Sequence, residues 1–331
     1  MGYEQIIQSA LDEIDRRITE NIGADELARA ANYSVHHFRR VFMKLTGMPF
    51  MNYITRRKLE YALYDLSQGR RIIDVAMDYG FETHPGFTKA FKKQFGYPPS
   101  LYRLHVSVSP PKRATINNVK LKHGWSDAPH PARPCSYRQQ SGFCSARGNQ
   151  GGINMQVQVK ELTPFAVVGY ASRHKIPGIK NMANLPGFYD TTKKDYGAEL
   201  STLYSTYKNF QHCEVILCLD VDEEQDCFTY MIGVGVGEAD YNVRLRPGTY
   251  KHEIPGGLYA VFTTPLANDD TQLTAIQDTW KYILEAWLPK SEYEYDDTRP
   301  DYEYHDERAH DDLRDDGKCC TEIRIPICKR M

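Results

Sequence analysis

Positively charged side chains follow one another at helical spacing in two short stretches of the first hundred residues. The first stretch contains His36, Arg39, Arg40 and Lys44, and the second contains Lys89, Lys92 and Lys93. No Asp or Glu occurs between Ser34 and Lys58 or between Thr83 and Arg103. An ordinary solvated helix face mixes both signs, whereas an acid-free basic face suits the phosphates and guanine edges of duplex DNA. Both stretches therefore predict DNA contact.

The charge is distributed unevenly along the 331 residues, although the net charge is only −2. Residues 1–113 carry about 17 Lys and Arg against about 12 Asp and Glu, and the remainder is net acidic. This asymmetry indicates a nucleic-acid surface confined to one of two domains. No apolar run approaches the length of a membrane span, and Met1–Gln8 lacks a signal pattern. With eight dispersed Cys expected to be reduced thiols, we expect a cytoplasmic protein that has no cofactor and no membrane partner.

A series of short helices must position the basic side chains. Ser34 is a suitable N-cap for a helix that runs to about Thr46, and Gly47 follows as its C-cap. An amphipathic helix and a short helix over 26–31 precede it, and a longer helix is predicted over 49–68. The first hundred residues are therefore predicted to be all-α.

The helical pattern occurs twice. The residues Leu27, Ala28, Phe38, Phe42, Gly47 and Pro49 recur, in the same order, as Val75, Ala76, Phe87, Phe91, Gly96 and Pro98. Two short helices joined by a tight turn, present in duplicate, are typical of a double helix-turn-helix. A plain helical bundle would explain the aromatic positions but not the acid-free faces. The long helix between the copies spans about 30 Å, close to the major-groove repeat of about 34 Å, so one chain can reach two successive grooves.

These stretches resemble the DNA-binding domain of the AraC/XylS family. The resemblance rests on Ala31-Asn-Tyr-Ser-Val-His-His-Phe-Arg-Arg-Val-Phe, on Ile72-Ile-Asp-Val-Ala-Met-Asp-Tyr-Gly-Phe-Glu and on Phe87-Thr-Lys-Ala-Phe-Lys-Lys-Gln-Phe-Gly-Tyr-Pro-Pro. It covers about a third of the chain and implies that residues 1–106 form a DNA-binding domain with two helix-turn-helix motifs.

The resemblance also implies which side chains face the DNA. In the first copy they are Ser34, as a cap near a phosphate, and His36, Arg39 and Arg40 in the groove. Arg reads guanine O6 and N7 in a bidentate way, and for Arg40 a phosphate contact is an equally good interpretation. In the second copy they are Thr83, His84, Thr88 and Lys89, with Lys92 as a phosphate contact or a solvated side chain. Because Gly86 offers nothing to a base, we expect the second helix mainly to position the protein on the DNA backbone.

Residues 107–152 are rich in Pro, Gly and Ser and keep no hydrophobic period, so we expect a tether. The segment contains zinc-binding residue types at His123, His130, Cys135 and Cys144. Their spacing matches no common zinc finger, and we expect no metal site.

Residues 153–331 combine strands with two helices. A hairpin around 163–164, a helix near 191–209 and two paired strands at 214–220 and 228–236 are predicted first. The same order then returns, as a hairpin over 249–263, a helix over 271–288 and final strands at 302–304 and 321–327. The predicted fold is α+β, built from a duplicated strand-helix-strand unit, with a ligand cleft where its halves meet.

This half resembles the GyrI-like effector-binding domain. The shared motifs are Pro164-Phe-Ala-Val-Val-Gly-Tyr, Gly256-Gly-Leu-Tyr-Ala-Val-Phe, Pro300-Asp-Tyr-Glu-Tyr and Ile323-Arg-Ile-Pro-Ile. The resemblance implies a pocket for small, often cationic and hydrophobic molecules, with a glutamate on its floor at the position of Glu303. On a strand Glu303 faces away from Tyr302 and Tyr304, and a carboxylate in an apolar cleft favours a cation. The alternative is a solvated Glu303, because residues 292–316 are rich in acids.

Aromatic side chains are the candidates for the pocket walls. They are Trp287, Phe188 and Tyr189. Trp287 also fits the apolar stripe of its helix, where a core position is the favoured role, and Trp280 is assigned to the core.

An AraC-type domain followed by a GyrI-like domain resembles the architecture of Rob-type regulators. We therefore expect a sequence-specific transcription regulator, not an enzyme, whose partners are double-stranded promoter DNA and a small cationic or amphipathic effector. RNA polymerase is a further candidate partner. One alternative is a GyrI-like small-molecule hydrolase fused to a DNA-binding module, but no Ser/His/Asp set and no G-x-S-x-G motif is recognisable. A second alternative is a drug-sequestering or interaction module without effect on transcription.

Overall fold

The computed structural model describes residues 2–106, 110–121, 155–176, 200–207, 213–237, 245–309 and 318–330. The chain divides into two compact units. Of the described residues, the first unit contains 2–65, 73–87 and 110–121, and the second unit contains the rest. The second unit therefore combines the strands with residues 66–72 and 88–106 of the helical region.

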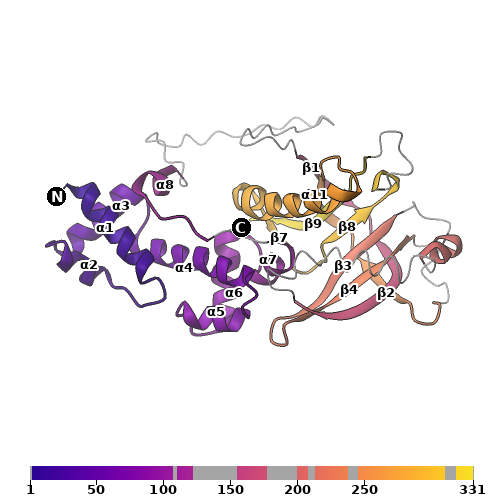
Figure 1. The fold of residues 1–331 in the computed structure, drawn as a ribbon, viewed down its shortest axis with the longest axis horizontal. Helices are drawn as coiled ribbons and strands as arrows, with labels where there is room; N and C mark the ends of the chain where they lie inside the picture. The colour runs from indigo at the N-terminus through magenta and orange to yellow at the C-terminus, as the bar shows by residue number, and fades with distance from the viewer. Residues whose placement is uncertain are drawn as a thin grey trace. The chain divides into compact units, whose positions relative to one another are not determined.

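Helices make up the first part of the chain (Figure 1). Their bounds are α1 (Tyr3–Arg16), α2 (Ala24–Ala30), α3 (Val35–Thr46), α4 (Phe50–Ser67), α5 (Ile72–Asp78), α6 (His84–Phe95), α7 (Pro99–His105) and α8 (Ile116–Leu121). Aromatic rings fill the core of the first unit: the ring of Phe42 lies 5.2 Å from that of Phe50 and 5.4 Å from that of Tyr53. The predicted helix over 49–68 and the predicted short helices before it are confirmed.

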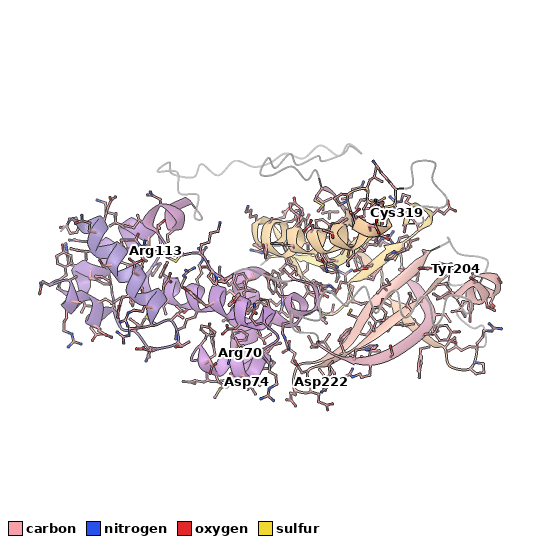
Figure 2. All side chains as sticks on the ribbon, viewed as in Figure 1. Arg70, Asp74, Arg113, Tyr204, Asp222 and Cys319 are labelled. Atoms are coloured by element: carbon pink, nitrogen blue, oxygen red, sulfur yellow. The ribbon has the colours of Figure 1, made fainter. Side chains whose placement is uncertain are left out.

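Residues 110–121 pack on α1, although sequence analysis placed them in a tether. The Gln8 amide donates to the Ala114 carbonyl at 2.9 Å and accepts from the Ile116 N–H at 3.2 Å. The Arg113 guanidinium donates to the Asp12 carboxylate at 2.8 and 2.6 Å, and Figure 2 shows Arg113 beside α1. The helical part of the chain thus extends past residue 106.

A buried ion pair ties this segment to α4. Arg57 is 6% exposed and donates to both carboxylate oxygens of Asp15, at 2.6 and 2.8 Å. Arg57 also donates to the Lys112 carbonyl at 2.6 Å, and Asp15 accepts from the Ala114 N–H at 3.2 Å. Arg57 therefore holds three segments together and is not available to a DNA phosphate.

The strands form one antiparallel sheet within the described residues. Their bounds are β1 (Gln156–Leu162), β2 (Phe165–Lys175), β3 (Glu214–Asp222), β4 (Cys227–Val236), β5 (Tyr250–Ile254), β6 (Gly257–Thr263), β7 (Tyr293–Tyr295), β8 (Tyr302–His305) and β9 (Glu322–Lys329). The order is β1-β6-β9-β8-β3-β4-β2-β5, and β7 pairs with β9. This order reads as two similar four-stranded halves joined at the β3–β8 pair, which confirms the predicted duplication.

The two halves exchange their first strands. β1 pairs with β6 and β5 pairs with β2, so the hairpins predicted around 163–164 and over 249–263 are wrong. The connections between these strands contain Pro164 and Pro255, and proline cannot donate to a ladder. A Cβ at Gly256 would lie 2.8 Å from the Leu162 carbonyl, so the two connections pass in close contact. By contrast, β3 and β4 pair as predicted.

Helices cover one face of the sheet. Residues 200–206 are helical and contribute Leu200 and Leu203 to the cluster that includes Ile232 and Phe228. Helix α11 (Asp269–Tyr282) begins at an Asn268 N-cap, continues as a π-helical turn over Ile283–Trp287, and contacts β9. The predicted α+β class is confirmed.

Replacing Asp15 with Asn should destabilise the helical part of the protein. The change leaves the buried Arg57 with only part of its charge compensation, which in comparable buried pairs costs about 3 kcal/mol. The free energy of unfolding can be measured by urea titration of far-ultraviolet circular dichroism. The matched control is Asp12→Asn, whose exposed pair with Arg113 should contribute much less, because water screens it. Equal losses in both variants would contradict the buried role of Asp15.

Candidate DNA interface and effector site

Helix α3 presents the first basic face. The Ser34 hydroxyl accepts a hydrogen bond from the His37 N–H at 3.2 Å, and Gly47 ends the helix with a φ of 77°, in the left-handed region. Phe38 and Phe42 are fully buried on the opposite side. The residues predicted to enter the groove are all exposed, namely His36, Arg39 and Arg40. Ser34 is thus confirmed as the N-cap of a helix whose basic face is open to solvent.

Arg39 and Arg40 differ in their surroundings. The Arg40 guanidinium lies 3.3 Å from Nδ1 of His37, whose ring packs edge-on against Tyr33 at 4.7 Å. Within the described part of the chain, Arg39 has neither a hydrogen bond nor an ion pair. An unengaged guanidinium keeps all five N–H donors for a base edge. Arg39 is therefore the stronger candidate for base reading.

Helix α6 presents the second basic face. The Thr83 hydroxyl accepts from the Gly86 N–H at 3.2 Å and caps the helix. A Cβ at position 86 would lie 2.9 Å from this hydroxyl oxygen, so glycine leaves room for the cap. Thr83 and Lys89 are exposed, as is Lys93.

Three other residues predicted to contact DNA from α6 are engaged or covered. The Thr88 hydroxyl and Nε2 of His84 are buried. Lys92 pairs with Asp297 at 2.8 Å, so its charge is already neutralised within the second unit. Helical periodicity placed these side chains on the right helix but could not show what packs beside them. Of the residues predicted to contact DNA from α6, Thr83 and Lys89 are thus exposed, whereas the polar groups of Thr88 and His84 are buried and Lys92 is paired.

Glu303 lies on β8, where the two halves of the sheet join. It pairs in register with Ile216 of β3 and with Ile323 of β9. Tyr302 and Tyr304 belong to the hydrophobic cluster of the other sheet face. The predicted alternation of Glu303 with its tyrosine neighbours is confirmed.

The Glu303 carboxylate is held by donors of the same unit. Its side chain is 18% exposed, the Trp280 indole N–H donates to Oε1 at 3.2 Å, and Nε2 of His305 lies 3.5 Å from Oε2. Burial raises the cost of ionisation, but the nearby imidazoles of His305 and His105 and the Trp280 N–H outweigh it. The pKa of Glu303 therefore lies below its ordinary value. The interpretation of Glu303 as a solvated acid is wrong.

Trp280 connects this carboxylate to helix α7. Trp280 is 2% exposed, and the His105 ring stacks on it with centroids 3.6 Å apart and planes at 11°. Nε2 of His105 lies 3.4 Å from the Asp301 carboxylate, which accepts a hydrogen bond from the Tyr295 hydroxyl at 2.6 Å. An ionised carboxylate with little access to water is suited to an organic cation, because the opposite charge offsets the cost of its burial.

The residues proposed as pocket walls have other positions. Trp287 packs against Phe262 at 5.0 Å and stacks on Tyr293 at 6.3 Å, and no contact with Glu303 is found among the described residues. Trp287 is half-buried, and its contacts with these two rings agree with the core role favoured for it. Phe188 and Tyr189 lie outside the described residues, as do the His and Cys considered for zinc.

Sequence reasoning missed the residues that surround Glu303. His305 was within reach, because it follows Glu303 by two residues on one strand and so shares its face. Trp280 and Trp287 both fit the apolar stripe of one helix, and periodicity cannot tell which of them meets the carboxylate. His105 is far away in the sequence, and no local pattern brings it to this site.

The described residues contain no group of three or more His, Cys, Asp and Glu side chains arranged to hold a metal ion. None of the helices in this part of the chain is both long and apolar enough to cross a membrane.

Two parts of the chain match known family models. Residues 27–105 match the model of a helix-turn-helix domain, and residues 158–327, about half of the chain, match the model described as integron-associated effector binding protein. The chain is 33% identical over 173 residues to the uncharacterized HTH-type transcriptional regulator YbfP of Bacillus subtilis, covering 51% of this chain and 57% of that protein. It therefore spans little more than half the length of this relative.

Two further similarities each cover one part of the chain. The HTH-type transcriptional activator AarP of Providencia stuartii is 38% identical over 100 residues, which are 30% of this chain and 74% of AarP. The solved structure of SAV2435 bound to tetraphenylphosphonium covers 52% of this chain and 94% of that one, with 17% identity and a TM-score of 0.37. From the match over residues 158–327, the chain belongs to the family of integron-associated effector binding proteins, and it carries a helix-turn-helix domain ahead of that region.

Proposed function

We propose that the protein is a ligand-responsive transcription regulator. Its helix-turn-helix region binds promoter DNA, and residues 153–331 bind a small cationic or amphipathic effector. One observation carries this proposal: a single chain combines an exposed, acid-free basic helix face with an ionised, largely buried carboxylate where two sheet halves join.

The DNA-binding part of the proposal rests on α3. Its basic side chains are exposed, its N-terminus is capped, and Arg39 has no competing partner among the described residues. Exposed cations give affinity for any duplex through the phosphates, and Arg in the groove adds a preference for guanine. Helix α6 offers fewer free side chains, so it is expected to position the protein more than to read bases.

The effector part rests on Glu303. A carboxylate with little exposure is stable only where donors or a cation offset its charge. In the absence of a ligand, the N–H of Trp280 and the imidazole of His305 offset the charge of Glu303. A lipophilic cation would supply a full positive charge together with apolar surface, and tetraphenylphosphonium is a suitable probe of that chemistry.

Regulation, rather than catalysis, is the role we propose for the second unit. The relatives YbfP and AarP carry the names of transcription regulators, and the helix-turn-helix match shows a module of that kind in this chain. A regulator acts by changing the recruitment or the access of RNA polymerase, so RNA polymerase is the third partner that we propose. Incubation of the protein with candidate effectors, followed by product analysis, tests this point: turnover of the effector would favour a hydrolase.

Arg39→Ala should relax base preference at one position of the bound site. Loss of a bidentate guanine contact costs about 1–3 kcal/mol of discrimination, which is about tenfold or more. The measurement is selection of bound duplexes from random DNA, followed by titration of single-base variants. Lys93→Ala is the control, because an exposed cation on α6 should weaken all sequences alike and reduce the salt slope by about 1. An Arg39→Ala protein with wild-type preference would overturn the assignment.

Glu303→Gln should weaken binding of tetraphenylphosphonium by about tenfold, which corresponds to about 1.4 kcal/mol, because the amide cannot neutralise the cation. Binding of a neutral triaryl compound, triphenylphosphine oxide, should change by less than about twofold, since only shape and apolar contact remain. Isothermal titration calorimetry measures both. The control variant is Glu307→Gln, which removes an exposed carboxylate from the same segment. If Glu303→Gln lost the same affinity for the cation and for the neutral compound, the charge of Glu303 would have no role in binding.

A further inference from the structure

Helix α7 belongs to the region matched by the helix-turn-helix model, yet it packs within the same compact unit as the strands. The fully buried guanidinium of Arg103 pairs with Asp226 on the turn between β3 and β4, with Nη2 at 3.1 Å from Oδ2. The Tyr102 hydroxyl donates to Glu285 at 3.0 Å, and Leu104 enters the hydrophobic cluster of β2 and β4. One helix of the DNA-binding region is therefore built into the effector-binding half.

The last residue of α7 reaches the Glu303 site. His105 stacks face to face on Trp280, and Trp280 donates its single N–H to Glu303. The same indole is thus fixed at two points: its edge by the carboxylate and its face by the imidazole. Since Trp280 is almost completely buried, it has little room to move without displacing one of these neighbours.

A cation bound at Glu303 changes the hydrogen bond between the Trp280 N–H and the carboxylate. It competes with the Trp280 N–H and with His305 for the carboxylate oxygens, whose hydrogen bonds weaken as the new ion pair forms. Any adjustment of the indole then acts directly on His105. A ligand can shift a conformational equilibrium only through contacts that differ between the two states, and this stack is a contact of that kind.

The connection from α7 back to α6 is short and stiff. Only residues 96–98 separate the two helices, Gly96 has a φ of 89°, and Pro98 precedes Pro99 at the start of α7. The rings of Tyr97 and Tyr102 are stacked, with centroids 6.0 Å apart and planes at 6°. A shift of α7 is therefore transmitted to the end of α6, the helix that carries the second basic face.

We propose that the Glu303 site is linked through Trp280 to His105 of α7, and that the His105–Trp280 stack couples effector binding to DNA binding. This inference rests on the proposed function, since it assumes that Glu303 accepts a cationic effector. His105 and Trp280 are positioning residues here: they transmit the state of the carboxylate and need not touch the effector.

The test measures DNA affinity of the full chain with and without saturating tetraphenylphosphonium, using a duplex obtained by selection. In the wild type the two dissociation constants should differ by a factor of about five or more, as is usual for allosteric coupling. In His105→Ala the two dissociation constants should differ by less than about twofold. DNA affinity without the probe should stay near the wild-type value. His105→Phe keeps a ring on Trp280 and should retain the coupling. His252→Ala, on β5, is the matched control and should also retain it.

A second variant keeps the inference testable if the His105→Ala protein does not fold. Trp280→Phe keeps a ring against His105 but has no N–H for Glu303, so it should also lose coupling. Wild-type coupling in both His105→Ala and Trp280→Phe would overturn the inference. A wild type that binds DNA and probe without coupling would overturn it as well, while leaving the two binding functions intact. A wild type that fails to bind the probe would instead refute the effector proposal, and the inference with it.

Discussion

The carboxylate of Glu303 is ionised in a position where water reaches little of it, and the surrounding structure is arranged to satisfy this one charge. Trp280 supplies an N–H, His305 supplies an imidazole, and His105 stacks on the indole from behind. A partly buried carboxylate without such partners would be protonated or would destabilise the fold. The same donors are the groups that an incoming cation must compete with, so the unliganded arrangement itself favours ligands with a full positive charge.

The exchange of strands between the two sheet halves explains why Glu303 lies where it does. Each half donates its first strand to the other, which leaves β3 and β8 as the central pair. Glu303 faces Ile216 across that pair, and three strands follow on either side of the pair in the strand order. A central strand cannot slip by one residue without moving its polar side chain to the tyrosine-lined face. The position of the carboxylate is therefore fixed by the topology and not by a mobile loop.

Local signals predicted the helical part well and the sheet only in outline. Ser34, Gly47 and the buried Phe pairs act through contacts within a few residues, so their roles could be read from spacing alone. The strand pairing of β1 and β5 depends on two proline-containing connections that meet at Gly256, which no short window shows. Likewise, Lys92 looks free on a helical wheel, but its partner Asp297 is distant in sequence. For the candidate site, Glu303 was found and its partners Trp280 and His105 were not, because burial and stacking between distant segments decide their roles.

The claim at the centre of this account is that Glu303 is held as a carboxylate by neighbouring donors. Infrared difference spectroscopy between the wild type and Glu303→Gln, followed as the pH is lowered, isolates the band of this one group. Because the folded-state pKa is depressed, the stabilising contribution of Glu303 is fully present above the ordinary pKa of a glutamate and is lost only as the pH falls through the lower, folded value. We expect the carboxylate band to persist at a pH equal to that ordinary pKa. A protonated carboxyl band for Glu303 at neutral pH would contradict the account.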